Sequence, residues 1–460
     1  MSDDATFFGD LLSSIADRGR ALLDRGGRTS GAIKAATLIE RCEALLSGRG
    51  EASGVALAAE ILDRYARMKI GERLAFFESL AETFGADRAR LDAALAALPQ
   101  ATGEAAASAA IAEIHAASEP RRQELFRRFN LAPGATLRLV RMREQLLDAL
   151  ELRRDLASVD NDFAHLFSSW FNRGFLVLRR IDWSTPANVL EKIIRYEAVH
   201  AIRDWNDLRA RVDSPDRRCY AFFHPALVDE PLIFVEVALT KEVPGAIAPI
   251  LDETRAPLAP EKATTAVFYS ISNCQRGLGG VSFGNFLIKQ VVEEISREIP
   301  ALNTFVTLSP VPGFGAWLAA ERKAEASRAL TPVDKEVLTA LDAPGWAEAP
   351  DVAKTVAPVL ATATAFYLVV ARSAKGRPLD PVARFHLGNG ARLERINPLG
   401  DLSPKALEQA AGMMVNYRYV PADIEKNHEA FAGKHEVVAS AAVKKLLRPD
   451  AQQRALVPAG

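Results

Sequence analysis

The amino-acid composition changes near residue 170, and this change limits the folds that the chain can adopt. The first 170 residues are rich in Ala, Leu, Arg and Glu, and apolar residues recur at helical spacing, as in Leu139, Met142 and Leu146. Breaks that contain Gly and Pro separate these segments, so several antiparallel helices joined by short loops are expected. Residues 1–170 are therefore predicted to form an all-α helical bundle domain.

After residue 170, the segments have the Val-, Ile- and Phe-rich composition of strands. Strands are expected in GFLVLRRIDW, RCYAFFHP, EPLIFVEVALT, TTAVFYSIS and TFVTLS. Helices are expected between them, including a helical insertion over roughly residues 331–371. The predicted fold class is therefore α+β, with a mixed-sheet domain over residues 171–460.

The segment PVARFHLGNGARLERI contains Asn389-Gly390, the dipeptide typical of a type I′ turn. We therefore expect a β-hairpin at this point of the chain. In that hairpin His386 lies on the first strand, on the same face as Val382 and Arg384.

Charge and cysteine content argue against several classes of partner. The 57 Lys and Arg residues are balanced by 58 Asp and Glu residues, so no nucleic-acid partner is expected. Cys42, Cys219 and Cys274 are far apart and have no metal-ligand spacing, so neither a metal site nor a disulfide framework is predicted. The start MSDDATFFGD lacks the pattern of a signal or transit peptide. The most apolar run, residues 356–371, is shorter than the ~20 residues of a spanning helix. We expect a cytoplasmic protein without a membrane partner.

A glycine-rich loop, QRGLGGVSFGNFLIK, follows an expected strand and precedes an apolar helix. Unpaired N–H groups in the first turn of a helix form an anion site, and glycine lets the backbone approach a phosphate closely. The spacing from Gly279 to Gly284 is that of a P-loop, but Asn285 and Phe286 replace the Lys and the hydroxyl residue, which excludes an ATPase. A dinucleotide fingerprint also fails, because Ser282 takes the place of its third glycine.

Three interpretations of this loop stay open. Gly280 to Gly284 matches Gly-x-Ser-x-Gly, and Asp380 and His386 follow in the chain order of a Ser-His-Asp thioesterase. However, the serine of such an elbow sits directly at the strand-to-helix corner, whereas here the strand is expected to end near Ser272. A turn without a ligand is the second interpretation, and a cradle for a diphosphate is the third.

Several motifs in one order favour the diphosphate cradle. The segment from Arg276 to Gly280 resembles the loop that holds the coenzyme A pyrophosphate in the GNAT acetyltransferase fold, although Val281 replaces its last Gly or Ala. FYSISNCQRGLGGVSFGNFLIK, TLSPVPGF, PVARFHLGNGARLERIN and GMMVNYRY together resemble the malonyl-CoA decarboxylase family. The resemblance extends from Trp170 to about Tyr419. It implies a GNAT-like mixed-sheet catalytic domain that follows an N-terminal helical domain.

The resemblance also implies a reaction and its residues: malonyl-CoA is converted to acetyl-CoA and CO₂. The family's catalytic serine falls at Ser309, its catalytic histidine at His386 and an active-site tyrosine at Tyr419. Its coenzyme A loop falls on Gly279, Gly280, Val281, Ser282, Phe283, Gly284 and Asn285. Some members of the family have an acidic residue where this chain has Ser282.

Decarboxylation of a malonyl thioester needs few catalytic groups. The thioester carbonyl itself accepts the electron pair left by the departing CO₂, which gives an enolate. No metal or separate cofactor is therefore expected, since coenzyme A is part of the substrate. The site must supply a donor to the enolate oxygen, a grip on the carboxylate and an acid for carbon. His386 suits the acid because the unperturbed pKa of histidine lies near neutrality. Ser309 either binds the carboxylate or helps to position the proton.

Two alternatives keep the fold but change the function: an acyl-CoA acyltransferase, and a non-catalytic scaffold protein that binds coenzyme A. The resemblance further implies a homo-oligomer, dimer or tetramer, that forms through the helical domain. An amphipathic bundle can bury an exposed apolar stripe against a second copy of itself.

Overall fold

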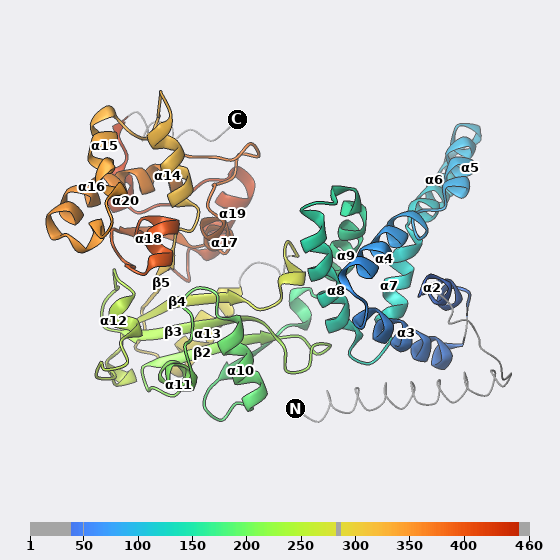
Figure 1. Ribbon diagram of the computed structural model, residues 1–460, viewed down its shortest axis with the longest axis horizontal. Helices are drawn as coiled ribbons and strands as arrows, with labels where there is room; N and C mark the ends of the chain where they lie inside the picture. Colours follow the sequence, from blue (N-terminus) through green and yellow to red (C-terminus); the bar gives the residue numbers. More distant parts are fainter. Residues whose placement is uncertain (1–37, 49, 282–286, 450–460) are drawn as a thin grey trace. The chain divides into compact units, whose positions relative to one another are not determined.

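The computed structural model describes residues 38–48, 50–281 and 287–449 (Figure 1). The chain divides into two compact units. The helical unit comprises Met1–Val177, Phe223–Glu230 and Gln275–Phe283, so it includes part of the glycine-rich loop. The sheet unit comprises Leu178–Phe222, Pro231–Cys274 and Gly284–Gly460.

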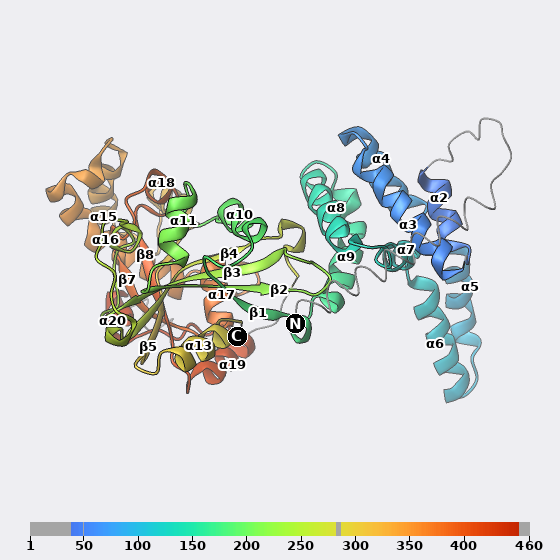
Figure 2. The ribbon, with the colours of Figure 1, turned by 90° about the horizontal axis from the view of Figure 1, so that it is seen from below.

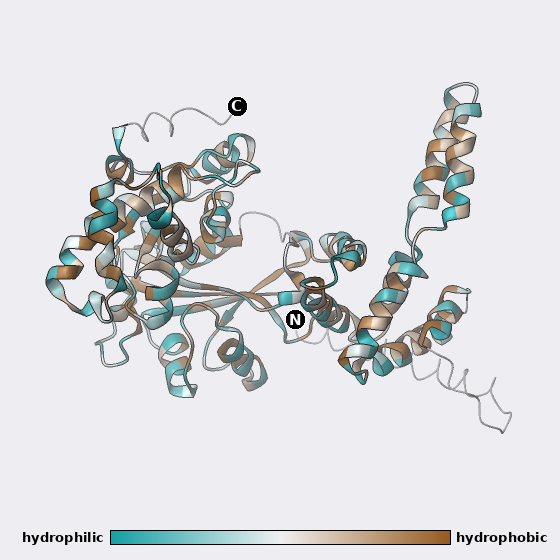
Figure 3. Ribbon diagram, turned by 45° about the horizontal axis from the view of Figure 1, so that its top comes forward, coloured by the Kyte–Doolittle hydropathy of each residue, from teal (hydrophilic) through white to brown (hydrophobic). Residues whose placement is uncertain are grey.

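The helical unit consists mainly of helices, as the apolar periodicity predicts. Leu139, Met142 and Leu146 are all buried on one helix face. The rings of Phe126 and Phe163 stack with their centroids 4.1 Å apart in the same core. Coloured by hydropathy, these helices carry both hydrophobic and hydrophilic residues (Figure 3). The described helices are α2 Leu38–Leu46, α3 Glu51–Ala66, α4 Ile70–Glu82, α5 Arg88–Ala97, α6 Glu104–Ser118, α7 Arg121–Phe129, α8 Ala135–Leu150 and α9 Ala157–Trp170.

An eight-stranded mixed sheet is the frame of the rest of the chain. Its order is β1-β2-β3-β4-β5-β8-β6, and β7 pairs with β8. The five strands predicted between Gly174 and Ser309 are all present, and the prediction of a mixed sheet is confirmed. The strands are β1 Val177–Ile181, β2 Arg217–Phe223, β3 Pro231–Thr240, β4 Thr265–Asn273, β5 Thr304–Thr307, β6 Ser309–Pro310, β7 Arg392–Asn397 and β8 Met414–Tyr419.

The parallel pair β4 and β5 diverges part of the way along its length. The two strands pair from Thr265 and Thr304 as far as Phe268 and Thr307. Beyond this point β4 continues to Asn273. The segment that follows β5 no longer pairs with β4 and forms β6, which begins at Ser309 and pairs with β8. Ser309 therefore lies next to the point where β4 and β5 separate.

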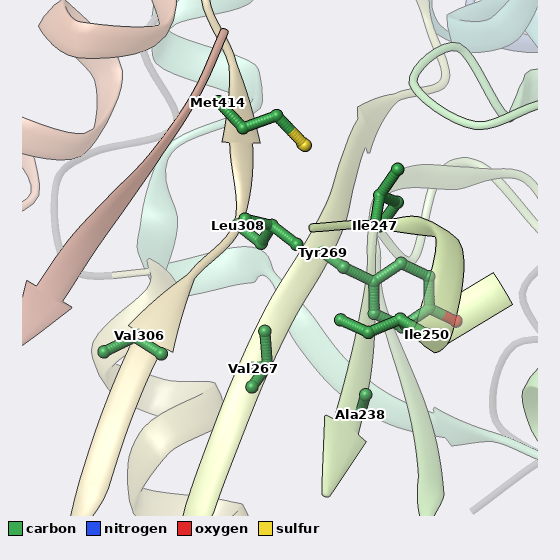
Figure 4. Packing of buried hydrophobic residues seen from close by; sticks show 8 residues of the cluster. All are labelled: Ala238, Ile247, Ile250, Val267, Tyr269, Val306, Leu308 and Met414. Carbon is green, nitrogen blue, oxygen red and sulfur yellow. The ribbon is translucent and has the colours of Figure 1, made fainter. Parts of the chain in front are cut away.

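Helices cover both faces of this sheet. Figure 2 shows α10 and α11 on one face and α13 on the other. The buried cluster of Figure 4 lies where β3, β4 and the β5–β6 segment meet α12, and it includes Val267, Tyr269 and Leu308. The helices of this unit are α10 Ala187–Tyr196, α11 Trp205–Val212, α12 Ala248–Leu251, α13 Leu287–Glu298, α14 Phe314–Lys323, α15 Pro332–Val337, α16 Pro350–Val369, α17 Pro381–Gly388, α18 Pro404–Ala410, α19 Ile424–Lys434 and α20 Ala441–Leu446.

The apolar run within the predicted helical insertion is part of a longer helix than expected. Helix α16 has 20 residues and continues through Pro358. Among the described residues, it is the one helix that is long and apolar enough to cross a membrane. Just over half of its most apolar window, 56%, is buried inside the protein, as in the core helix of a globular domain. The prediction that this segment is too short to span a membrane is therefore wrong, because the helix that contains it has 20 residues.

The predicted β-hairpin around Asn389-Gly390 is wrong. Residues Pro381–Gly388 form helix α17, and the side chain of Asp380 caps it by accepting the N–H of Ala383 at 2.8 Å. Gly390, with φ +82°, ends the helix, because left-handed glycines stop helices as readily as they close hairpins. A Cβ on Gly390 would lie 2.2 Å from the carbonyl oxygen of Ile424, so the glycine is also required for close packing.

Candidate active site

Three of the predicted site residues, Ser309, His386 and Tyr419, come together in the sheet unit. Ser309 begins β6, His386 lies on α17 and Tyr419 ends β8. The Nε2 atom of His386 is 3.2 Å from the Oγ of Ser309, and its Nδ1 atom is 2.8 Å from the hydroxyl of Tyr419. All three side chains are buried. The structure therefore brings together residues that lie up to 110 positions apart, the separation between 309 and 419.

The imidazole ring of His386 is held from several sides. Helix α17 carries it, and the cap by Asp380 fixes where that helix begins. The ring of Tyr417 stacks on the imidazole with a centroid distance of 4.6 Å and an interplanar angle of 23°. Tyr419 is fixed in turn by its pairing with Phe305 in β5. The ring therefore has little freedom to turn away from Ser309.

A fourth polar residue, Thr307, completes the hydrogen-bond chain. Its Oγ1 accepts the hydroxyl proton of Ser309 at 2.8 Å and the backbone N–H of Tyr417 at 3.1 Å. Thr307 is fully buried. The sequence analysis did not identify Thr307. Its position two residues before Ser309 was a signal, because side chains two apart in an extended chain point to the same side. Thr307 thus orients the hydroxyl of Ser309.

This chain of hydrogen bonds determines which ring nitrogen carries the proton. Because the hydrogen of Ser309 points to Thr307, the Oγ of Ser309 accepts from the Nε2–H of His386. The Nδ1 atom is then an acceptor, and the hydroxyl of Tyr419 donates to it. Burial raises the pKa of Tyr419 well above its usual value, which keeps the phenol protonated and able to donate.

His386 is neutral near pH 7, contrary to the expectation of an unperturbed pKa. Burial lowers the pKa of His386 to about 3. The cause is the loss of water around the charged form, and no charge from a described residue offsets it. A histidine of ordinary pKa would be partly protonated near neutrality, whereas burial keeps this ring neutral there.

The geometry does not form the triad of a Ser-His-Asp thioesterase. In such a triad a carboxylate accepts the Nδ1–H of the histidine. Here Nδ1 bonds to the phenol of Tyr419, and a carboxylate oxygen of Asp380 caps α17. Ser282, the serine of that alternative, lies outside the described residues.

The described part of the glycine-rich loop uses most of its amides internally. Residues Arg276–Leu278 form a short 3-10 helix. The N–H groups of Leu278, Gly279 and Val281 donate to carbonyl oxygens within the loop at 2.9 to 3.0 Å. Gly280 is exposed and has φ +77°. Of the predicted coenzyme A contacts, Ser282, Phe283, Gly284 and Asn285 lie outside the described residues, so the cradle stays a prediction.

The described residues hold no group of three or more His, Cys, Asp or Glu side chains that could bind a metal ion. All three cysteines are buried, and none of them is in a disulfide. Cys42 is in the helical unit, where burial raises the pKa of its thiol to about 12.

Comparison with known proteins gives a consistent result along the chain. The family model of the malonyl-CoA decarboxylase C-terminal domain matches residues 174–457, and that of the malonyl-CoA decarboxylase N-terminal domain matches residues 84–171. The chain is 36% identical over 408 residues to malonyl-CoA decarboxylase, mitochondrial, of Anser anser anser, which covers 82% of this chain and 80% of that protein. It is 35% identical to the protein of the same name from Rattus norvegicus, with 82% of each covered.

Solved structures give the same picture at higher identity. The crystal structure of malonyl-CoA decarboxylase from Rhodopseudomonas palustris is 58% identical with a TM-score of 0.86, and covers 89% of this chain and 98% of that chain. The one from Agrobacterium vitis is 57% identical with a TM-score of 0.84, and covers 89% and 99%. The predicted fold class, a helical domain followed by a mixed-sheet domain, is confirmed. The likeness of the sheet domain to the GNAT fold stays a prediction.

The depressed pKa of His386 makes the stability of the protein depend on pH. Between the ordinary histidine pKa of ~6.5 and the value of about 3, the unfolded chain binds more protons than the folded chain at this residue. His386 therefore costs stability as the pH falls. When the pH is lowered from about 7 to about 4.5, we expect the free energy of unfolding to fall less in His386→Asn than in the wild type.

Urea unfolding midpoints at the two pH values measure this difference. His115→Asn, a substitution of an exposed histidine on α6, is the control and should follow the wild type. Equal pH dependence in His386→Asn and the wild type would contradict a buried neutral imidazole.

Proposed function

The chain belongs to the malonyl-CoA decarboxylase family, and from that premise we propose that it converts malonyl-CoA to acetyl-CoA and CO₂ at Ser309, His386 and Tyr419. The observation that carries the proposal is the buried, hydrogen-bonded contact of the three side chains. They lie in the part of the chain that the C-terminal family model matches. Burial excludes water from a reaction whose enolate must receive one proton at one carbon.

The reaction is balanced by a single proton. The bond between the α-carbon and the carboxylate breaks, its electron pair moves into the thioester as an enolate, and CO₂ leaves. The enolate then takes up one proton at carbon to give the acetyl group. Since malonyl-CoA carries the carboxylate charge that CO₂ lacks, one proton is consumed in each turnover.

We assign the delivery of this proton to His386. The ring is neutral in the empty site, and the negative charge of the bound substrate raises its pKa toward protonation. Tyr419 holds the ring at Nδ1, so the proton-bearing Nε2 faces Ser309. The hydroxyl of Ser309 lies next to Nε2, where it positions the substrate carboxylate or passes on the proton.

Other parts of the proposed function have less structural support and stay predictions. They are the coenzyme A cradle over 279–285, the domain boundary at 170 and 171, self-association through the helical domain, and a cytoplasmic location. Coenzyme A enters as part of the substrate. The curated relatives named above are mitochondrial proteins by name, and the residues that precede Leu38 are outside the described part of this chain.

Turnover of malonyl-CoA, followed as both acetyl-CoA and CO₂, tests the proposed reaction. We expect the wild type to form both products, and His386→Asn and Ser309→Ala to lose at least about a hundredfold in kcat while still binding coenzyme A. His435→Asn is the matched control, because Asn accepts the left-handed backbone of that residue. A wild type that binds coenzyme A without forming acetyl-CoA would overturn the proposal in favour of a scaffold. Acetyl transfer to an amine in place of decarboxylation would favour an acyltransferase.

The role of Tyr419 is tested against its neighbour Tyr417. Tyr419→Phe removes the donor to Nδ1, and we expect kcat to fall about tenfold or more, as the loss of a hydrogen bond worth about 1.4 kcal/mol gives. Tyr417→Phe keeps the ring that stacks on His386, and its hydroxyl has no hydrogen-bond partner among the described residues, so a smaller effect is expected. Equal losses in the two variants would contradict a specific role for the phenol of Tyr419.

A further inference from the structure

Helix α8 of the helical unit carries a buried arginine that binds the glycine-rich loop. Only 3% of the surface of Arg143 is exposed. Its Nη1 donates to the carbonyl oxygens of Gly277 and Gly279, each at 2.9 Å. Its Nε donates to Asp160 of α9 at 2.7 Å, so the buried charge is neutralised within the same unit. Arg143 therefore fixes two peptide groups of the loop, each more than 130 positions away from it in the sequence.

Close packing on the same helix supports this anchoring. A Cβ on Gly277 would lie 2.0 Å from the carbonyl oxygen of Val140, so the loop touches α8 at a point where only glycine fits. Next to it, Arg276 bonds to Glu144 and Asp148 on α8. The loop thus begins on a rigid base that the helices provide.

We propose that Arg143 is a positioning residue for the coenzyme A diphosphate, which it affects through the loop backbone without touching the substrate. This inference rests on the proposed function, in which the loop receives coenzyme A. Arg143 turns the carbonyl oxygens of Gly277 and Gly279 toward itself, and such oxygens would repel a phosphate if they faced it. In a trans peptide the N–H lies opposite the carbonyl oxygen, so the N–H of Gly280 points away from Arg143.

The orientation of Gly280 is what makes the anchoring useful to a ligand. Gly280 is exposed, and its positive φ of 77° lets the backbone turn directly after the fixed peptide. A loop whose amide is already turned outward loses less conformational entropy when a diphosphate binds. The helical unit would then contribute to substrate affinity as well as to association between copies.

The experiment compares substrates with and without the nucleotide diphosphate. Arg143→Met removes all the hydrogen bonds of the guanidinium, and Arg143→Lys keeps the charge beside Asp160 with a single ammonium group. Arg138→Met on the same helix is the matched control, since Arg138 bonds to the more exposed Asp63. The measurements are kcat and KM with malonyl-CoA and with malonyl-pantetheine, and the Kd of coenzyme A and of pantetheine by calorimetry.

We expect Arg143→Met to lose about tenfold to a hundredfold in kcat/KM for malonyl-CoA, mainly through KM, with less than about a threefold change for malonyl-pantetheine. Arg143→Lys should recover part of the loss, and Arg138→Met should resemble the wild type. Equal losses with both substrates would show a general structural role and overturn the proposal, as would an unchanged Kd for coenzyme A.

The binding measurement separates this proposal from the proposed function. If the wild type does not decarboxylate malonyl-CoA, the proposed function fails, but a weaker Kd for coenzyme A in Arg143→Met still supports the role of Arg143. If Arg143→Met does not fold, the Kd of Arg143→Lys decides, and an affinity equal to that of the wild type overturns the proposal.

Discussion

Burial of an uncharged imidazole is the constraint on which the candidate active site depends. The imidazole of His386 lies between the hydroxyl groups of Ser309 and Tyr419. Burial lowers its pKa to about 3, because the charged ring would lose its hydration. No charge from a described residue stabilises the protonated ring, so the ring is neutral near pH 7. In the proposed reaction, the negative charge of the substrate raises the pKa of His386, so that the acid forms when the substrate is bound.

The sheet explains why these groups meet. Strand β5 stops pairing with β4 at Thr307, and β6 begins at Ser309, opposite Val415 near the start of β8. Tyr419 ends β8 and lies opposite Phe305 of β5. Strands fix both hydroxyls, and a capped helix fixes the histidine. Sites built on strands and helices hold their side chains more accurately than sites built on loops. The glycine-rich loop takes its rigidity instead from helix α8, through the buried guanidinium of Arg143.

Local patterns were enough to predict the helical and sheet regions, because apolar spacing reports directly on helix and strand faces. Ser309, His386 and Tyr419 were found through the order of several motifs, which no single motif would have supplied. The hairpin at Asn389-Gly390 failed because the same dipeptide ends helices and closes hairpins, and the choice depends on packing against Ile424. The neutral state of His386 and the contact of Arg143 with the loop depend on burial and on distant parts of the chain, so periodicity and spacing carry no sign of them.

The protonation state of His386 is the central physical claim, and nitrogen NMR of protein labelled with ¹⁵N-histidine measures it directly. The His386→Asn spectrum identifies the signals of this ring among those of the 7 histidines. We expect a neutral ring with Nε2 protonated and Nδ1 unprotonated, unchanged between about pH 8 and about pH 5 in the free protein. A ring that gains a proton near pH ~6.5, or one that carries its proton on Nδ1, would contradict the hydrogen-bond chain from Tyr419 to Thr307.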